Sequence, residues 1–271
     1  MKNSSTRLIV AAAVSALASA AQAAPLNLSG WSALTLDYPG GQAAGNWVLA
    51  GGNTEVTQTV NADPSFYLNN QVQTSYKIQG SWQVTSAAGD DDYMGFVFGY
   101  QNSSNFYLFD WKAATQGYVG RTAAEGMTIK KFTGGTGNGL TDLSLEEFWE
   151  NQVDFGDMDV LATNHATTGG WAAGALYDFY LDYNTTPGQF KIIVKQGATE
   201  QWDVTVNDAT FAAGGQFGFY NNSQANVRYA GFEQEIIDPD PDPNPVPEPG
   251  TLALLAIGLA GLRATRRRHQ N

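Results

Sequence analysis

The sequence has 271 residues, a formal net charge of −12 at pH 7 from 14 basic and 26 acidic residues, and no cysteine. The absence of cysteine excludes disulfides, thiol catalysis, Cys-rich zinc sites and iron–sulfur clusters. The negative charge disfavours nucleic acid and anionic lipid as partners and favours divalent cations, although solubility alone also explains an acidic surface. Apart from His269, the single histidine is His165, so the sequence offers few histidines for a nucleophile triad or a His-based metal site.

Residues 1–23 predict a secretory signal peptide. Lys2 and Arg7 precede an apolar, alanine-rich run at 8–17, and the small residues at 21–23 suit a signal peptidase cleavage site. We expect cleavage after Ala23, followed by a single domain at 24–237.

Residues 238–249 alternate proline with polar residues, a composition that favours an extended linker. The apolar run at 251–262 is shorter than the roughly 20 residues that a membrane-spanning helix needs. Positive charge follows it directly, as in a stop-transfer signal. We therefore expect residues 250–271 to form a hydrophobic helix with an arginine cluster, made of Arg263, Arg266, Arg267 and Arg268.

The run Val246-Pro-Glu-Pro-Gly250, the short apolar helix and the arginines together resemble the PEP-CTERM sorting signal of Gram-negative bacteria. Pro247, Glu248 and Pro249 stand at its signature positions. The resemblance implies transient anchoring in the inner membrane through this transmembrane helix, cleavage by an exosortase, and a final location that is secreted or at the cell surface. A simple tail anchor is the alternative.

Strand patterns dominate residues 24–237. The segments 177–183, 190–194 and 202–206 alternate apolar and polar residues, as in antiparallel sheets with one buried face. The segments 94–100 and 106–111 are apolar on both faces and predict central strands joined by a turn. Residues 143–151 fit either a short helix or a loop. The pattern predicts an all-β, two-sheet sandwich of the jelly-roll kind.

The run from Asp90 to Lys112, with Gly95-Phe-Val-Phe-Gly-Tyr-Gln101 at its centre, resembles the thrombospondin C-terminal domain. Matching segments at 57–64, 217–224 and 227–232 extend the resemblance from about Glu55 to Gln234. It implies a concanavalin-like, L-type-lectin-like β-sandwich that binds calcium and acts in extracellular adhesion. The Asp-rich calcium repeats that precede this domain in animal proteins have no counterpart here, so no animal receptor is carried over.

Calcium takes six to eight oxygen ligands, and adjacent carboxylates on a loop can supply several of them. The expected ligands are three aspartates before a strand and two polar residues that could join them: Asp90, Asp91, Asp92, Asp63 and Asn102. Strand alternation would let at most two of the three consecutive aspartates face one ion. The alternative is a solvated acidic turn.

A second acidic group could support glycoside hydrolysis, which needs two carboxylates facing each other, but it matches no catalytic pattern: Glu146, Glu147, Glu150, Asp154, Asp157 and Asp159. Trp149 and Trp171 could stack on sugars if exposed, although a core position is favoured for each. We expect a non-enzymatic, calcium-binding adhesion or matrix protein that contacts matrix polysaccharide or a surface protein. A lectin-like carbohydrate-binding module is the first alternative, and a glycoside hydrolase-like enzyme is the weaker one.

Overall fold

A computed structural model describes residues 25–86, 89–166 and 169–236. The predicted signal peptide, linker and sorting tail lie outside these residues. In the described ranges, no helix combines the length and apolar character that crossing a bilayer requires.

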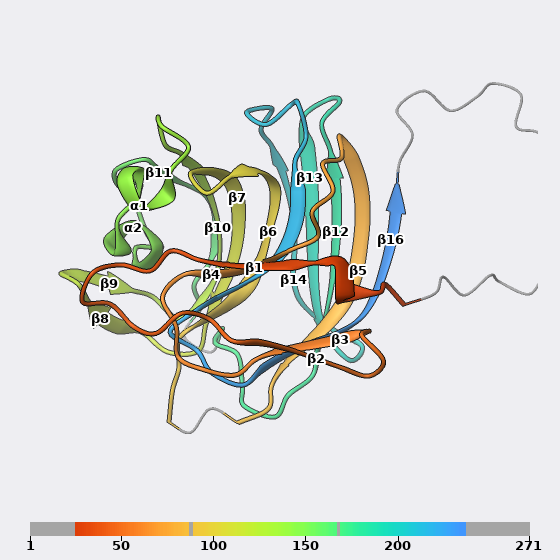
Figure 1. The fold of residues 1–271 in the computed structure, drawn as a ribbon, viewed down its shortest axis with the longest axis horizontal. Helices are drawn as coiled ribbons and strands as arrows, with labels where there is room; N and C mark the ends of the chain where they lie inside the picture. The colour runs from red at the N-terminus through yellow and green to blue at the C-terminus, as the bar shows by residue number, and fades with distance from the viewer. Residues whose placement is uncertain (1–24, 87–88, 167–168, 237–271) are drawn as a thin grey trace, which may run out of the picture.

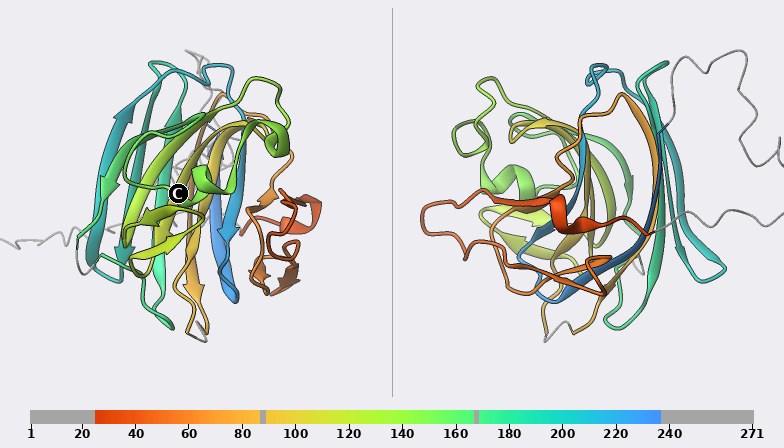
Figure 2. Two further views of the ribbon diagram at one scale, coloured as in Figure 1. Left: turned by 90° about the vertical axis from the view of Figure 1, so that its left-hand side faces the viewer. Right: turned by 45° about the vertical axis from the view of Figure 1, so that its right-hand side comes forward.

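Two seven-stranded antiparallel sheets pack face to face (Figures 1 and 2). The inner sheet contains, in spatial order, β1 (Ser32–Thr35), β4 (Ser65–Leu68), β15 (Gln216–Asn222), β6 (Tyr93–Asn102), β7 (Asn105–Lys112), β10 (Gly126–Thr133) and β11 (Met158–Asn164). The outer sheet contains β14 (Thr199–Asn207), β13 (Gln189–Gln196), β12 (Tyr177–Asn184), β5 (Ser75–Val84), β16 (Val227–Ile236), β3 (Glu55–Gln58) and β2 (Trp47–Ala50). This architecture confirms the all-β, jelly-roll or concanavalin-like sandwich expected from the sequence.

An aromatic core fills the space between the two sheets. The ring of Trp82 on β5 stacks on Phe179 of β12 with centroids 4.7 Å apart, and Phe96 stacks on Phe109 at 4.9 Å. Side chains alternate between buried and more exposed along β12, as its sequence pattern predicts. At Gly95 on β6 a Cβ would clash with the carbonyl oxygen of Phe109 on β7, so close pairing of these central strands requires glycine there.

A third layer, which we call the lid, covers the other face of the inner sheet. It consists of the hairpin β8 (Gln116–Tyr118) and β9 (Arg121–Ala123) with the helices α1 (Gly139–Asp142) and α2 (Leu145–Trp149). A short 3₁₀ turn, η1 (Leu28–Gly30), precedes β1. Figure 1 shows the lid on the side of the inner sheet that faces away from the outer sheet.

Helix α2 resolves the ambiguity of residues 143–151. It begins with a capping box in which the side chains of Ser144 and Glu147 each accept a hydrogen bond from the other's backbone N–H. Phe148 then packs against Phe66, Phe106 and Phe132 of the inner sheet, which gives the lid an aromatic core of its own.

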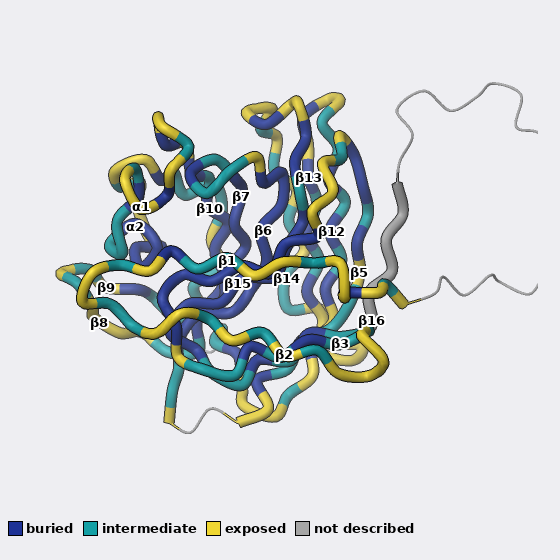
Figure 3. Tube along the Cα trace, viewed as in Figure 1, coloured by how far each residue is buried: buried dark blue, intermediate teal, exposed yellow. Residues whose placement is uncertain are grey.

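The lid explains why the central strands are apolar on both faces. Figure 3 shows β6, β7 and β15 buried along almost their whole lengths, whereas strands of the outer sheet alternate. Trp149 and Trp171 are only 2% and 5% exposed, so both occupy the core position that the sequence favoured. The lid-facing side of the inner sheet is therefore closed to any large ligand.

Two fully buried charges lie beneath the lid. The ammonium of Lys130 on β10 lies 2.7 Å from the Asp110 carboxylate on β7 and donates a hydrogen bond to the Phe148 carbonyl oxygen at 2.8 Å. Burial raises the pKa of Asp110 to about 6 even though Lys130 opposes the shift. Burial likewise lowers the pKa of Lys130, and Asp110 opposes that change. Through its hydrogen bond to Phe148, Lys130 links this pair to α2.

We predict that Asp110→Leu lowers the free energy of unfolding by about 3–5 kcal/mol, because it leaves the Lys130 charge buried without its partner. The double variant Asp110→Leu/Lys130→Met should recover most of that loss, since both buried charges are then removed. Urea denaturation measures both effects. The control is Asp203→Asn, which breaks a half-exposed pair with Lys191 and should cost less than about 1 kcal/mol.

The same variants test the pKa of Asp110. Because this pKa is raised, the group favours folding while protonated; its contribution is complete below 3.8 and is lost as the pH rises through about 6. Relative to the double variant, the wild type should therefore lose stability across that window. A constant difference from pH 4 to 7 would contradict the buried-carboxyl interpretation.

Candidate cation-binding site

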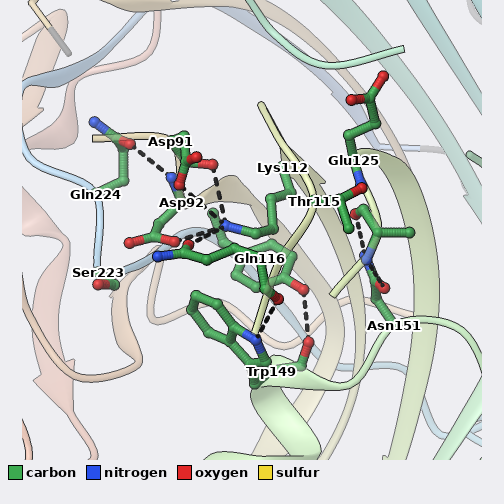
Figure 4. A network of polar contacts seen from close by, with 12 residues as sticks. Asp91, Asp92, Lys112, Thr115, Gln116, Glu125, Trp149, Asn151, Ser223 and Gln224 are labelled. Atoms are coloured by element: carbon green, nitrogen blue, oxygen red, sulfur yellow. Dashed lines mark hydrogen bonds and ion pairs between the residues drawn. The ribbon is translucent and has the colours of Figure 1, made fainter. Parts of the chain in front are cut away.

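Asp90, Asp91 and Asp92 lie directly before β6, at the end of the sandwich where β15 connects to β16. The backbone there is held on three sides. The Asp92 N–H donates to the Gln224 side chain at 3.0 Å, the Asp91 carbonyl accepts from the Ala113 N–H at 3.0 Å, and the Asp92 carbonyl accepts from the Trp171 indole at 2.9 Å. Asp91 and Asp92 therefore occupy a fixed position and not a loose acidic turn (Figure 4).

Lys112, at the end of β7, supplies a cation to this cluster. Its fully buried ammonium lies 2.7 Å from the Asp92 carboxylate and 3.4 Å from that of Asp91. The same ammonium donates to Gln116 at 2.9 Å and lies 4.5 Å from the centre of the Trp149 ring (Figure 4). Asp91 and Asp92 thus share a positive charge from the chain itself. Lys112 was not among the site residues expected from the sequence, although a lysine at the end of a strand that is apolar on both faces indicates a buried partner.

Asp90 is the member of the cluster without such a countercharge. Its Oδ2 atom is buried and has no hydrogen-bond partner in the described part of the chain. Burial first, and then repulsion from Asp92, raises the pKa of Asp90 to about 6. A raised carboxyl pKa beside a second carboxylate is the electrostatic signature of a place where an added cation would be favoured.

The oxygen atoms in this cluster are of the kind that calcium binds, but the cluster supplies only two carboxylates for an ion. Asp90 and Asp92 offer carboxylate oxygens, and the side-chain oxygen of Gln42, tied to Ser223 through its amide at 2.7 Å, is also buried and without a partner. Within the described ranges, no group of three or more acidic, histidine or cysteine side chains is gathered around one point. An ion here would take two carboxylates and complete its shell with uncharged oxygens and water.

Asp63 and Asn102, the other two expected ligands, have different positions. Both oxygens of the buried Asp63 carboxylate accept backbone N–H groups, from Tyr38 and Gln42 at 2.8 Å each. A Cβ at Gly41 would clash with this carboxylate, so the loop closes around it only with glycine there. Asn102 caps the β6–β7 turn, where its Oδ1 accepts from the Ser104 N–H at 3.0 Å.

Strand length separates Asn102 from the aspartates. The two positions stand at opposite ends of the ten-residue strand β6, which spans about 30 Å at ~3.3 Å per residue. The structure therefore brings together Asp90, Asp91 and Asp92 and does not bring Asn102 to them.

Four of the six carboxylates in the second acidic group have structural partners. Glu147 caps α2 and also accepts the Asp157 N–H at 2.6 Å, while Asp154 accepts the Val160 N–H at 2.8 Å. Glu150 lies 3.7 Å from Arg121, and Asp159 lies 3.1 Å from Lys131. These carboxylates hold the lid and β11 in place.

Comparison with known proteins gives two family matches. Residues 42–238 match the thrombospondin C-terminal region, and residues 245–268 match the PEP-CTERM protein-sorting motif. The second match indicates export through the inner membrane to the cell surface of a Gram-negative bacterium.

Curated relatives support the first match. Thrombospondin-4-B of Danio rerio is 29% identical over 198 residues, covering 71% of this chain and 20% of the relative. Thrombospondin-2 of Gallus gallus is 31% identical over 199 residues, covering 71% of this chain and 16% of the relative. The chain thus spans about a fifth of the length of these relatives.

The fold is shared with solved structures, of which a lumenal domain is an example. The exoplasmic/lumenal domain of VIP36, in a Ca²⁺/Man3GlcNAc-bound form, aligns with a TM-score of 0.50 at 9% identity, covering 79% of this chain and 86% of that one.

We predict that Asp63→Asn releases the loop at residues 38–42 because an amide cannot accept both N–H groups. Loss of a charge-assisted hydrogen bond should speed hydrogen exchange at the Tyr38 and Gln42 amides by about 10- to 100-fold. Exchange mass spectrometry measures this, and Asp37→Asn, at a neighbouring exposed carboxylate, is the control. If a calcium chelator speeds the same amides equally in the wild type, Asp63 acts through an ion and not as a direct clip.

Proposed function

The chain belongs to the thrombospondin C-terminal family, and from this premise we propose that it is an exported, non-catalytic binding domain stabilised by calcium at Asp90 and Asp92. It works in adhesion or matrix assembly outside the cell, where it contacts a matrix polysaccharide or a surface protein. Membership of the family and the sorting motif support the extracellular role.

One observation carries the calcium proposal. The Asp90 oxygen is buried without a partner beside a second carboxylate, and Lys112 engages Asp91 and Asp92 but not Asp90. A divalent cation supplies the charge that this arrangement lacks, and calcium accepts the oxygen donors present. Asp90 and Asp92 would hold it. The bound ion would tie the start of β6 to the β15–β16 connection and so stiffen the loops at this end of the sandwich.

The proposal excludes catalysis by the second acidic group. Glycoside hydrolysis needs one carboxyl group free to give up or take a proton and a second that faces it across the substrate. Glu147, Glu150 and Asp159 are instead occupied as helix cap and ion-pair partners. Binding without turnover is the function that these contacts support.

The sorting tail completes the proposal. Pro247, Glu248 and Pro249 form the recognition motif, the apolar segment after them anchors the chain transiently in the inner membrane, and the arginines at 263 and 266–268 remain on the cytoplasmic side. A signal peptidase removes the N-terminal segment and an exosortase cleaves near the motif.

We predict that the exported chain binds calcium with a Kd of about 0.1–1 mM, as in other extracellular calcium sites. At a hundredfold excess over Kd, calcium should raise the free energy of unfolding by about 2.7 kcal/mol. Calorimetric titration and thermal denaturation measure the two quantities. The variant Asp90→Ala/Asp92→Ala should lose both effects, since it removes the only charged ligands proposed.

A matched control removes the same charge elsewhere. Asp37→Ala/Asp157→Ala deletes two exposed carboxylates and should leave the titration unchanged. Wild-type protein that shows no heat of binding and no calcium-dependent melting shift would refute the calcium site. If both double variants lost calcium binding equally, the binding would be due to the general negative charge of the surface and not to a site.

We also predict that replacing residues 247–249 by alanine blocks processing, because the exosortase then lacks its motif. The chain should accumulate uncleaved in the inner-membrane fraction, with a mass that still includes the arginine cluster. Cell fractionation and mass spectrometry of the C-terminal peptide measure this. Alanine at residues 241–243, in the preceding linker, is the control and should be processed normally.

A further inference from the structure

We propose that Lys112 sets the cation selectivity of the site at Asp90 and Asp92, because its buried ammonium is a fixed positive charge that any bound ion must face. The inference rests on the proposed calcium site and deepens it by naming the class of ion that the site prefers. Three ionised aspartates and one lysine give the cluster a net charge of −2, which one divalent cation balances. Without the lysine the net charge would be −3, and a trivalent cation would be favoured more strongly.

Asp92 is the group that the lysine and the proposed ion would share. Its Oδ1 atom lies 2.7 Å from the Lys112 ammonium, and its carboxylate stands beside that of Asp90. The Asp92 side chain is only 6% exposed, so water screens little of the repulsion between the ammonium and an ion on the same carboxylate. The charge of Lys112 therefore acts on the ion at short range.

The Lys112 ammonium is held in place on its other sides as well. It donates to the Asp91 carbonyl oxygen at 3.2 Å and to the Gln116 side chain at 2.9 Å, and its own side chain is fully buried. The Trp149 ring packs against it, with 4.5 Å between the ammonium and the ring centre (Figure 4). Leaving these contacts for an apolar part of the interior would cost free energy, because the charge would lose its partners. Lys112 is therefore a permanent part of the site and not a mobile surface charge.

Repulsion from a fixed charge grows in proportion to the charge of the ion. In free energy, Lys112 therefore opposes a trivalent ion about one and a half times as strongly as a divalent ion in the same position. Terbium(III) is a suitable trivalent probe, because it takes oxygen ligands as calcium does and is close to calcium in size. If Lys112 acted through packing alone, its removal would change the affinities for the two ions by the same factor.

Lys130 provides a matched comparison beneath the same lid. It is fully buried, as Lys112 is, but its ammonium pairs with Asp110 at 2.7 Å, and no ion pair in the described ranges joins it to the three consecutive aspartates. Removal of either lysine leaves a buried carboxylate without its partner, so both variants should lose stability in the presence of a chelator. Only the loss of Lys112 should change the binding of ions.

The test measures calcium and terbium binding by the full exported chain, in an uncharged detergent near neutral pH. Titration calorimetry gives the Kd for calcium. Terbium luminescence, excited through the Trp171 indole that donates to the Asp92 carbonyl at 2.9 Å, gives the Kd for terbium. Lys112→Met should tighten calcium binding about tenfold and terbium binding about 30-fold, since the two changes in free energy stand in the ratio of the ion charges. Lys130→Met should change neither affinity by more than about threefold, because the lysine that it removes is paired elsewhere.

Asp91→Asn provides a second measurement that does not depend on the folding of Lys112→Met. The Asp91 side chain is 35% exposed and is not a proposed ligand, and the amide that replaces it keeps an oxygen for the Lys112 ammonium. With one negative charge fewer, the Kd should rise about threefold for calcium and about fivefold for terbium. An equal rise for the two ions would show that binding does not respond to the charge of the cluster, and this would overturn the role of Lys112.

The results separate this inference from the calcium proposal. If the wild type and both lysine variants bind calcium with the same Kd, or if Lys112→Met tightens the binding of both ions equally, the site exists and Lys112 does not set its selectivity. If Lys112→Met binds an ion and the wild type binds none, the electrostatic role of Lys112 holds and the calcium proposal fails. If no variant binds either ion, both fail. Thermal denaturation in a chelator and in calcium establishes that each variant is folded.

Discussion

Two buried lysines under the lid are the constraint on which the rest of the architecture depends. Lys112 and Lys130 project from the inner sheet into an environment where an unpaired ammonium is not tolerated. Lys130 pairs with Asp110 on β7 and Lys112 with Asp92 just before β6. Each also contacts α2, through the Phe148 carbonyl for Lys130 and the Trp149 ring for Lys112. The helix is therefore positioned by direction-specific contacts as well as by aromatic packing, and the lid cannot shift without exposing a charge.

The same constraint divides the three consecutive aspartates. The buried ammonium of Lys112 forms ion pairs with Asp91 and Asp92 and with neither oxygen of Asp90. Asp90 remains beside Asp92, and its buried Oδ2 atom has no hydrogen-bond partner in the described chain. Burial is the main cause of the raised pKa of Asp90, and repulsion from Asp92 adds to it. The buried internal cation and the proposed external cation site thus follow from one arrangement of charges.

The sequence predicted those features of the fold that follow from the periodicity of single strands. Alternation along β12 and β13 gave the buried faces, and apolar runs gave the paired strands β6 and β7. The lid was not predictable in this way, because its contacts join residues far apart in sequence. In the sequence, Lys112 is simply the end of a strand, and only the fold shows that its ammonium lies beside the Asp92 carboxylate. Asn102 does not lie near the aspartates because the ten-residue strand β6 separates the two positions by its whole length.

Closure of one face by the lid determines where a ligand can go. The inner sheet is packed on both sides, so its polar groups serve stability and its aromatic residues form two cores. The outer sheet packs one face against the inner sheet, and along β12 and β13 the side chains of its other face are partly or fully exposed. Binding at the open sheet and ion binding at the end of the sandwich would then be spatially separate. An ion that stiffens the loops would support the scaffold that holds the open face of the outer sheet without lying on that face itself.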